Sequence, residues 1–173
     1  MTAQPPEPVL HAPRREASHL NARVCTESDV NTLVELYRAF RDALVSERGG
    51  SVHLLKEGFA EPLEEHFAAI IDDLEQLVLL GTLDAVPVGL AIARLAEMPD
   101  SSTVASVEAL YVDPAAREVG VGEKLLEAII DWATRRGATG VDVHVLPGMR
   151  APKSFLEGSG FVARLLVMHR KLI

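Results

Sequence analysis

The sequence has little cysteine, no long apolar run and no excess of positive charge, and each absence excludes a class of protein. Cys25 is the only cysteine among 173 residues, so no disulfide can form within the chain and a reducing compartment is expected. No run of about 18 apolar residues is present to cross a membrane. The proline-rich N-terminus also lacks the apolar core of a signal peptide. We therefore predict a cytoplasmic protein that does not use a membrane.

The shortage of positive charge also limits the classes of molecule that the protein can bind. The formal net charge is −8 at pH 7, whereas a protein that binds nucleic acid needs a basic face to displace counterions. We therefore expect no nucleic-acid partner. A negative chain suits a cationic substrate such as an amine, although solubility alone explains the same charge.

The length is that of one domain. A chain of 173 residues can bury a substantial core. Residues 1–19 contain Pro5, Pro6, Pro8 and Pro13 among small and charged residues, which is typical of a disordered tail. We predict a disordered tail over residues 1–19 and a single folded domain over residues 20–173.

The most informative stretch runs from residue 108 to residue 126. Its first part is β-branched and aromatic and ends at Asp113–Pro114, because proline disfavours helical geometry in the residue before it. Its last part opens a helix with Val121 and Leu125 on one face. Gly120 and Gly122 lie between strand and helix. A helix N-terminus that backbone can approach closely is typical of a phosphate site.

Two common phosphate motifs do not fit this stretch. A dinucleotide fingerprint needs a small residue three positions after its second glycine, where this chain has Leu125. A P-loop needs lysine followed by serine or threonine, but Gly122 is followed by Glu123. A plain structural turn also remains open. The pattern that does fit is Arg117-x-x-Gly120-x-Gly122, which resembles the pyrophosphate loop of the GNAT family of N-acetyltransferases.

Two further segments carry the same resemblance. The strand Leu110–Pro114 is similar to the fourth strand of the GNAT family, and Phe155–Phe161 is similar to its short helix that ends in Gly-Phe. Both come in the order that the family has, and the resemblance extends from about Leu20 to the C-terminus. It implies an α/β (α+β) fold with a mixed, mostly antiparallel sheet of roughly six to seven strands and about four helices on both faces.

Hydrophobic periodicity places the elements of this fold. Alternation predicts strands at Leu20–Cys25, Gln76–Leu83, Val86–Glu97, Thr103–Val112, Val141–Leu146 and Phe161–Leu172. Helical spacing predicts helices after the capping box Thr26–Asp29, from about Pro62, from about Val119 to Arg136, and over Met149–Ser159. The middle of the sheet should be an antiparallel meander, with the fifth strand parallel to the fourth. The irregular segment Arg48–Glu61 should border the acceptor pocket, or else form a solvated connection.

The resemblance implies an acetyl-CoA-dependent N-acetyltransferase that acts on a primary amine of a small molecule or a protein N-terminus. We expect no metal, because no residues with metal-ligand spacing accompany His144. The resemblance assigns the cofactor to the edge of the fourth strand and to the amides that follow, namely Leu110, Tyr111, Val112, Arg117, Glu118, Val119, Gly120, Val121, Gly122 and Glu123. Glu118 stands where many relatives have glycine, and its carboxylate should point away from the diphosphate.

Glu108 is the candidate general base, because the family commonly draws its base from this strand. Strand alternation predicts that it shares a face with Ser106, Leu110 and Val112, with Tyr111 on the opposite face. A strand glutamate that only forms a salt bridge is the competing interpretation. His144 and Cys25 lack the neighbours of a metal site or an activated nucleophile.

The sequence departs from the family pattern at the general acid. Leu156 occupies the position of the usual tyrosine, and Met149 and Pro152 replace the asparagine and alanine of the same signature. These departures favour a rival hypothesis, a module that binds acyl-CoA as a sensor or scaffold without catalysis. The identity of the amine acceptor and the oligomeric state, a homodimer included, stay open.

Overall fold

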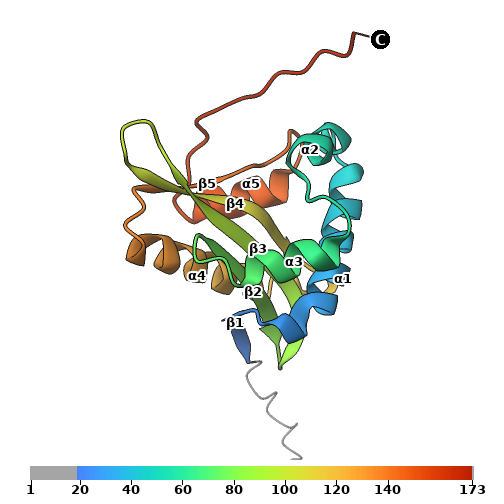
Figure 1. The fold of residues 1–173 in the computed structure, drawn as a ribbon. Coiled ribbons are helices and arrows are strands. Elements are labelled where there is room, and N and C mark those ends of the chain that lie inside the picture. The colour runs from blue at the N-terminus through green and yellow to red at the C-terminus, as the bar shows by residue number, and fades with distance from the viewer. Residues whose placement is uncertain (1–18, 173) are drawn as a thin grey trace, which may run out of the picture.

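A computed structural model describes residues 19–172 and shows one mixed sheet with helices on both faces (Figure 1). The strands are β1 (Leu20–Val24), β2 (Gln76–Leu83), β3 (Val86–Glu97), β4 (Thr103–Val112) and β5 (Gly140–Val143). The helices are α1 (Val30–Val45), α2 (Gly50–Glu57), α3 (Leu63–Ile71), α4 (Val121–Arg135) and α5 (Arg150–Gly158). The predicted tail lies outside the described residues except for His19.

The sheet is a meander with one crossover. Its strand order is β1-β2-β3-β4-β5, so every strand lies beside its predecessor in the chain. The first four strands pair antiparallel, and β5 pairs parallel with β4 after the chain has passed through α4. The turn between β2 and β3 places Asp84 and Ala85 in the left-handed region, with φ of 49° and 66°, which matches the twist of a tight hairpin. The predicted meander is confirmed.

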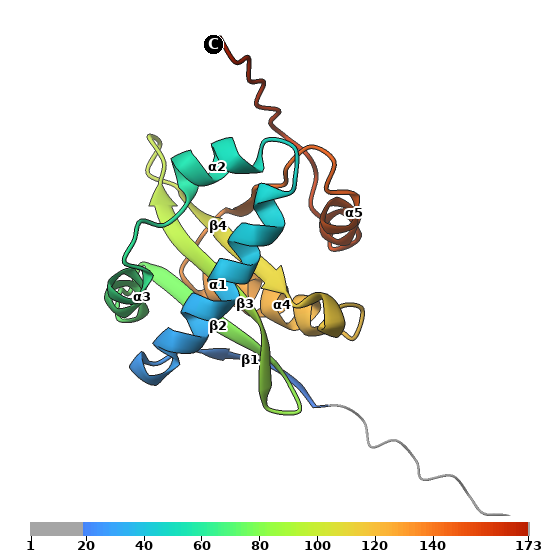
Figure 2. The same ribbon diagram turned by 90° about the vertical axis from the view of Figure 1, so that its right-hand side faces the viewer.

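Two apolar layers cover the sheet. On one face α1 and α3 pack on it through a core that includes Leu33, Tyr37 and Phe67. On the other face α4 packs through Leu125 and Ile129 (Figure 2). Helical residues three and four apart therefore point inward, as their spacing predicts.

The start of the first helical segment agrees with the predicted capping box. The backbone N–H of Thr26 donates to Asp29 Oδ2 at 2.9 Å. Asp29 also accepts two hydrogen bonds from Arg23 on β1, at 2.6 and 2.7 Å. Hydrogen bonding from Arg23 holds the pKa of Asp29 well below its usual range, which keeps the carboxylate charged and ties β1 to the helix.

The expected numbers of strands and helices are slightly wrong. The described residues form five strands and five α-helices, because α2 lies within the segment expected to be irregular and Phe161–Leu172 forms no strand. Within the described part of the chain, no backbone hydrogen bond joins residues 162–172 to another segment. The fifth strand is also shorter than predicted and ends at Val143, where its pairing with β4 ends.

None of the helices in residues 19–172 combines the length and the apolar character needed to cross a membrane.

Candidate active site

The candidate base lies at a β-bulge. Ile92 of β3 is opposite Ala109 and the next residue, Ala93, is opposite Val107, so Glu108 has no partner on β3. A bulge reverses the alternation of the residues that follow it. Accordingly Val107 packs in the core under α4, whereas Ala109 packs in the core under α1 and α3.

The bulge corrects two sequence predictions. Tyr111 belongs to the core under α1 and α3, while Leu110 and Val112 pack against the core on the α4 side. The carboxylate of Glu108 acts electrostatically on Tyr37 of α1 and on His66 of α3, which places it on their side of the sheet. The prediction that Glu108 shares a face with Leu110 and Val112 is therefore wrong. Tyr111 lies on the face of Glu108 and not on the opposite one.

The sheet opens beside this bulge. β5 pairs with β4 only from Val104 to Val107, so residues 108–112 of β4 have no strand on that side. The backbone N–H and C=O groups on this edge can therefore hydrogen-bond an extended ligand, as the edge of a sheet does in strand addition.

The loop that follows β4 leads into a helix N-terminus suited to anions. Asp113 Oδ1 accepts a hydrogen bond from the backbone N–H of Ala115 at 2.8 Å, and Arg117 Nε donates to the carbonyl of Val112 at 3.2 Å. Gly120 then takes a φ of 101° as the N-cap of α4. Within the described chain, the backbone amides of residues 119–123 have no hydrogen-bond acceptor. Free amides and the helix dipole together favour a phosphate here.

The side chains of Glu118 and Phe155 border this loop. Glu118 is exposed and has a φ of 64°, a left-handed conformation that costs a non-glycine residue of order 1 kcal/mol. A Cβ built on Gly122 would lie 3.6 Å from the ring of Phe155, which is ordinary contact. α5 therefore packs directly against the first turn of α4 and forms one wall of the loop.

Glu108 forms an ion pair, as the competing interpretation of the sequence expected, and its partner is Arg94. Arg94 Nε of β3 lies 2.5 Å from Glu108 Oε1. The side chain of Arg94 is 50% exposed and that of Glu108 is 21% exposed. Solvent screens such a pair, and exposed ion pairs typically contribute about 1 kcal/mol or less. A bound cation can therefore compete with Arg94 for the carboxylate.

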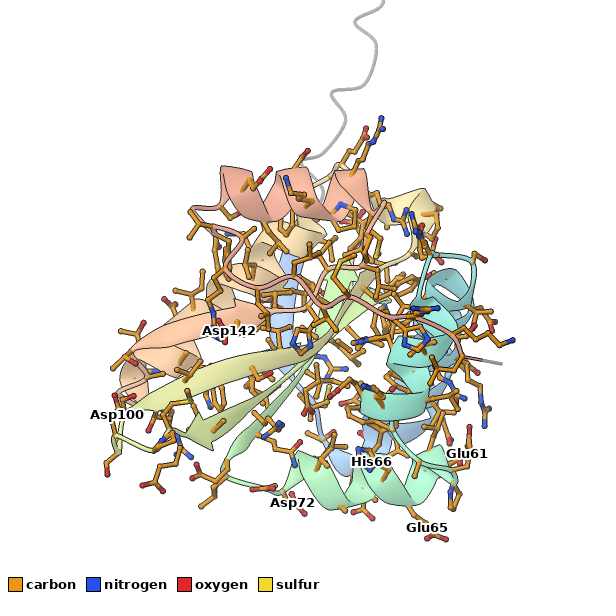
Figure 3. The ribbon with its side chains drawn as sticks, turned by 90° about the horizontal axis from the view of Figure 1, so that it is seen from above. Glu61, Glu65, His66, Asp72, Asp100 and Asp142 are labelled. Carbon is orange, nitrogen blue, oxygen red and sulfur yellow. The ribbon has the colours of Figure 1, made fainter. Side chains whose placement is uncertain are left out.

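A cluster of aromatic rings lies on the side of the bulge that faces α1 and α3. Phe59 stacks on Tyr37 with ring centroids 4.8 Å apart and lies 4.2 Å from the ring of His66. The backbone N–H of Phe59 donates to Tyr37 Oη at 2.9 Å, which fixes the segment before α3 against α1. Figure 3 shows His66 on α3, on the side of the molecule away from Asp142 of β5.

His66 lies close enough to Glu108 to feel its charge, and the sequence analysis did not name it. Its Nε2 atom is buried and has no hydrogen-bond partner among the described residues. Burial lowers the pKa of His66, with a smaller opposing effect from Glu108. The signal was present, because residue 66 lies three positions after the inward-facing Leu63 and next to the inward-facing Phe67.

The segment Arg48–Glu61, which was expected to border the acceptor pocket, contains α2. This helix reaches the β5 side of the opening between β4 and β5. α2 carries His53, whose ring centroid lies 5.9 Å from that of His144, just after β5, in an edge-to-face arrangement. Burial lowers the pKa of His53, and the neighbouring His144 lowers it further. This contact joins α2 to the carboxyl end of β5.

The structure limits the residues that could act as the general acid. Leu156 is buried on α5 and offers no hydroxyl. The chain has two tyrosines, and Tyr37 Oη already accepts the hydrogen bond from Phe59. Tyr111 is the other, and burial raises its pKa. Both phenols lie on the face of Glu108, and Tyr111 is the less buried of the two, with 8% of its surface exposed against 2% for Tyr37.

Other reactive groups do not form a second centre in the described residues. No group of three or more His, Cys, Asp or Glu residues within 19–172 could hold a metal ion. Cys25 is buried, and burial raises the pKa of its thiol to about 12, so it is not an activated nucleophile.

Comparisons with known proteins agree with this geometry. The sequence profile described as Acetyltransferase (GNAT) family matches residues 33–161. No curated protein matches the chain. Many solved structures share the fold. The tetramutant of the BH1408 protein from Bacillus halodurans has a TM-score of 0.71 at 19% identity, covering 87% of this chain and 99% of its own.

Two aminoglycoside-related structures are similar to the chain as well. Aminoglycoside acetyltransferase meta-AAC0020, from an uncultured soil metagenomic sample and in complex with trehalose, has a TM-score of 0.68 at 20% identity, covering 91% of this chain and 96% of its own. AAC(6')-Iy, in complex with the bisubstrate analog CoA-S-monomethyl-acetylneamine, has a TM-score of 0.63 at 22% identity, covering 90% and 99%. At these identities the likeness shows a shared fold.

Proposed function

Because the chain belongs to the acetyltransferase (GNAT) family, we propose that it is an acetyl-CoA-dependent N-acetyltransferase whose acceptor is a primary amine of a small molecule or of a protein N-terminus. The observation that carries the proposal is the juxtaposition at the end of β4. A carboxylate at the bulge, an open strand edge and a helix N-terminus with free amides follow one another within residues 108–123.

The loop and the strand edge have separate roles toward the cofactor. The diphosphate of acetyl-CoA accepts hydrogen bonds from the amides of residues 119–123, where the dipole of α4 adds to the attraction. The pantetheine arm pairs with the open edge of Leu110 and Val112. Arg117 is exposed beside the loop and adds positive charge. This arrangement brings the thioester toward Glu108.

The chemistry is direct transfer. The neutral amine attacks the thioester carbonyl carbon, the C–N bond forms, the C–S bond breaks and CoA leaves as a thiolate. Glu108 accepts the proton that the amine loses, directly or through a water molecule. The thiolate takes a proton from Tyr111 or from water, and a thiol with a pKa of about 8.5 tolerates either route.

A small cationic acceptor is supported by charge and by the neighbours. The chain has a formal net charge of −8, and the screened Arg94–Glu108 pair can exchange its cation. One neighbour is an aminoglycoside acetyltransferase, and another is in complex with a bisubstrate analog of CoA and an acetylneamine. We therefore propose polyamines and aminosugars as the first acceptors to test.

A second candidate function is a module that binds acyl-CoA without catalysis. The buried Leu156 in place of a hydroxyl favours it, as does the engagement of Glu108 by Arg94. It shares the cofactor site with the first proposal, so CoA binding alone does not separate the two.

Thiol release from acetyl-CoA, measured over a panel of amines, separates them. We expect release with at least one amine, and we expect Glu108→Gln to lower turnover by about 10²–10⁴ while CoA affinity measured by calorimetry is unchanged. Glu97→Gln is the matched control, because Glu97 is an exposed glutamate on β3 at the far end of the strand. Firm CoA binding with no thiol release for any amine would favour the binding module.

A further inference from the structure

The ion pair between Arg94 and Glu108 leaves hydrogen-bonding groups unused at both of its ends. Arg94 Nε donates to Glu108 Oε1 at 2.5 Å. Among the described residues, the two terminal nitrogens of the Arg94 guanidinium have no hydrogen-bond acceptor, and Glu108 Oε2 has no donor. A guanidinium carries five N–H donors and a carboxylate accepts at both oxygens. The pair therefore presents a cationic end and an anionic end, and each can bind a further charged group.

Both ends lie on the face of the sheet where the proposed base acts. Leu90 and Ile92 of β3 pack in the core under α1 and α3, so strand alternation places Arg94 on the same face. The bulge directs Glu108 to that face as well. The side chain of Arg94 is half exposed and that of Glu108 is partly exposed, so a small molecule has access to the pair from solvent.

The guanidinium determines which amines fit beside Glu108. A polyamine or an aminosugar supplies an ammonium group for Glu108, but it also places positive charge next to Arg94, and like charges repel. An amine that carries a carboxylate as well supplies a partner for each end of the pair. The formal net charge of −8 disfavours an acceptor that is negative overall, so the acceptor should have at least as many amines as carboxylates.

We propose that the acceptor is a free α-amino acid, an inference that rests on the N-acetyltransferase function proposed above. Its carboxylate binds the terminal nitrogens of Arg94, because the planar guanidinium matches the two oxygens of a carboxylate. Its amine binds Glu108 Oε2. Both groups are attached to the same carbon atom in an α-amino acid, which suits the adjacent charges of an ion pair in direct contact. The N-terminus of a protein has an amide in place of this carboxylate and leaves Arg94 without its ligand.

The same arrangement distinguishes substrate from product. Glu108 takes a proton from the α-ammonium group, the neutral nitrogen attacks the thioester carbonyl carbon, the C–N bond forms, and the C–S bond breaks as CoA leaves. The product is an N-acetyl amino acid, and its amide nitrogen carries no positive charge. Arg94 therefore binds substrate and product alike, whereas Glu108 attracts the substrate alone, which favours release of the product.

Acceptors that differ only in the carboxylate test the proposal. Neutral L-amino acids are each compared with the amine that lacks the carboxylate, such as L-leucine with isoamylamine and L-phenylalanine with phenethylamine, by thiol release from acetyl-CoA. The measured quantity is the ratio of kcat/KM for the amino acid to kcat/KM for its amine. Arg94→Gln should lower this ratio about 10–100-fold, mainly through KM, because the charge-assisted hydrogen bonds to the carboxylate are lost. The different reactivities of the two amines cancel when the ratios of the two proteins are compared.

Two further variants make the test specific. Arg94→Lys should restore part of the ratio, because it keeps the charge and loses the planar fork. Arg38→Gln is the matched control, since Arg38 of α1 is an arginine of similar exposure in an ion pair with Glu64, and it should leave the ratio unchanged. Arg94 and Arg38 are both about half exposed, so these variants should fold, which circular dichroism checks.

The outcomes separate this proposal from the function on which it rests. Thiol release with amines but with no amino acid, or a ratio that Arg94→Gln leaves unchanged, would overturn the amino acid acceptor and leave the N-acetyltransferase. A folded Arg94→Gln protein that loses turnover equally for both members of every pair would show that Arg94 only positions Glu108, and would overturn the proposal too. No thiol release with any acceptor would overturn the proposed function and this inference together.

Discussion

At the scale of single residues, the bulge gives Glu108 a position that no regular strand would give it. Regular pairing would have placed Glu108 opposite a residue of β3, with Tyr111 on the other face of the sheet. The bulge instead directs Glu108 toward α1 and α3 and brings Tyr111 onto that same face. The carboxylate and the phenol can therefore serve one proposed site although they lie three residues apart on one strand.

Removal of the Tyr111 hydroxyl tests its proposed role as the acid. Tyr111→Phe should lower turnover by about 10²-fold, because protonation of the thiolate then depends on water alone. Stability should change little, since that hydroxyl has no hydrogen-bond partner among the described residues. Tyr37→Phe is the control, because it breaks the contact with Phe59 and should cost about 1 kcal/mol in the free energy of unfolding. Equal turnover in wild type and Tyr111→Phe would leave the acid role to water.

Glu118 combines backbone strain with an unfavourable charge, and two substitutions separate these effects. Glu118→Gly should raise the free energy of unfolding by up to about 1 kcal/mol, because glycine adopts a φ of 64° without strain. Glu118→Gln should leave stability unchanged, since the strain stays. Both should tighten CoA binding in calorimetry, because each removes a negative charge near the diphosphate. Unchanged CoA affinity in both variants would show that Glu118 lies too far from the cofactor to matter.

At the scale of elements, the N-terminus of α4 is the part of the fold on which the proposed cofactor site depends. Gly120→Asp should abolish measurable CoA binding, because the new carboxylate would accept hydrogen bonds from the amides meant for phosphate and would repel the diphosphate. Gly120→Ala is the matched control, since it also adds a Cβ at a φ of 101°, 2.9 Å from Leu20, but without the charge. We expect the alanine variant to bind more weakly than wild type and the aspartate variant not to bind. Equal affinity in the two variants would remove the loop from the cofactor site.

The elements that are predicted best from the sequence are those in which one buried face gives a regular pattern of apolar residues. Strands β2, β3 and β4 have the predicted bounds, because alternating apolar residues and the turn at Asp84–Ala85 mark them directly. Helix α4 has nearly the predicted bounds for the same reason. α2 was missed, because Gly49 and Gly50 indicated a break and eight residues are too few for a clear period.

Motifs in the sequence identify Glu108 and the glycine loop of the candidate site, whereas the surroundings of these residues do not follow from any motif. A bulge is a choice of hydrogen-bond register and leaves no residue signature in this strand, so the face of Tyr111 could not be foreseen. The ion pair with Arg94 depends on the same register. The predicted final strand is wrong for a different reason: its residues favour a strand, but residues 162–172 make no backbone hydrogen bond to the rest of the described chain.

At the scale of the whole molecule, two partly buried histidines should make the protein less stable in mild acid. Burial lowers the pKa of His53 and of His66 below the ordinary value of 6.5. Their contribution is therefore complete above pH 6.5 and is lost as the pH falls through the lower pKa values of the folded state, because the unfolded chain then binds more protons. The free energy of unfolding should fall between pH 7 and pH 5, as chemical denaturation at several pH values would measure.

Substitution of His53 or His66 should make the free energy of unfolding depend less on pH. His53→Gln and His66→Gln should each reduce the loss of stability between pH 7 and pH 5, whatever their effect at neutral pH. His19→Gln is the control, since that side chain is exposed. An unchanged slope in both variants would show that carboxylates alone, such as Asp29 and Asp142 with their lowered pKa values, determine the acid sensitivity.

The agreement between strand order and chain order has a consequence for how the molecule folds. Each hairpin of the β1-to-β4 meander closes a short loop, so this part can form early at a small entropic cost, apart from the longer link between β1 and β2. β5 should join only after α4 has formed its crossover, so the opening between β4 and β5 should be a late feature of folding. Kinetic φ-values should accordingly be high for Leu80→Ala and Ile92→Val in the meander and low for Val141→Ala in β5. A new chain would then acquire a stable sheet before it acquires the opening proposed for the thioester.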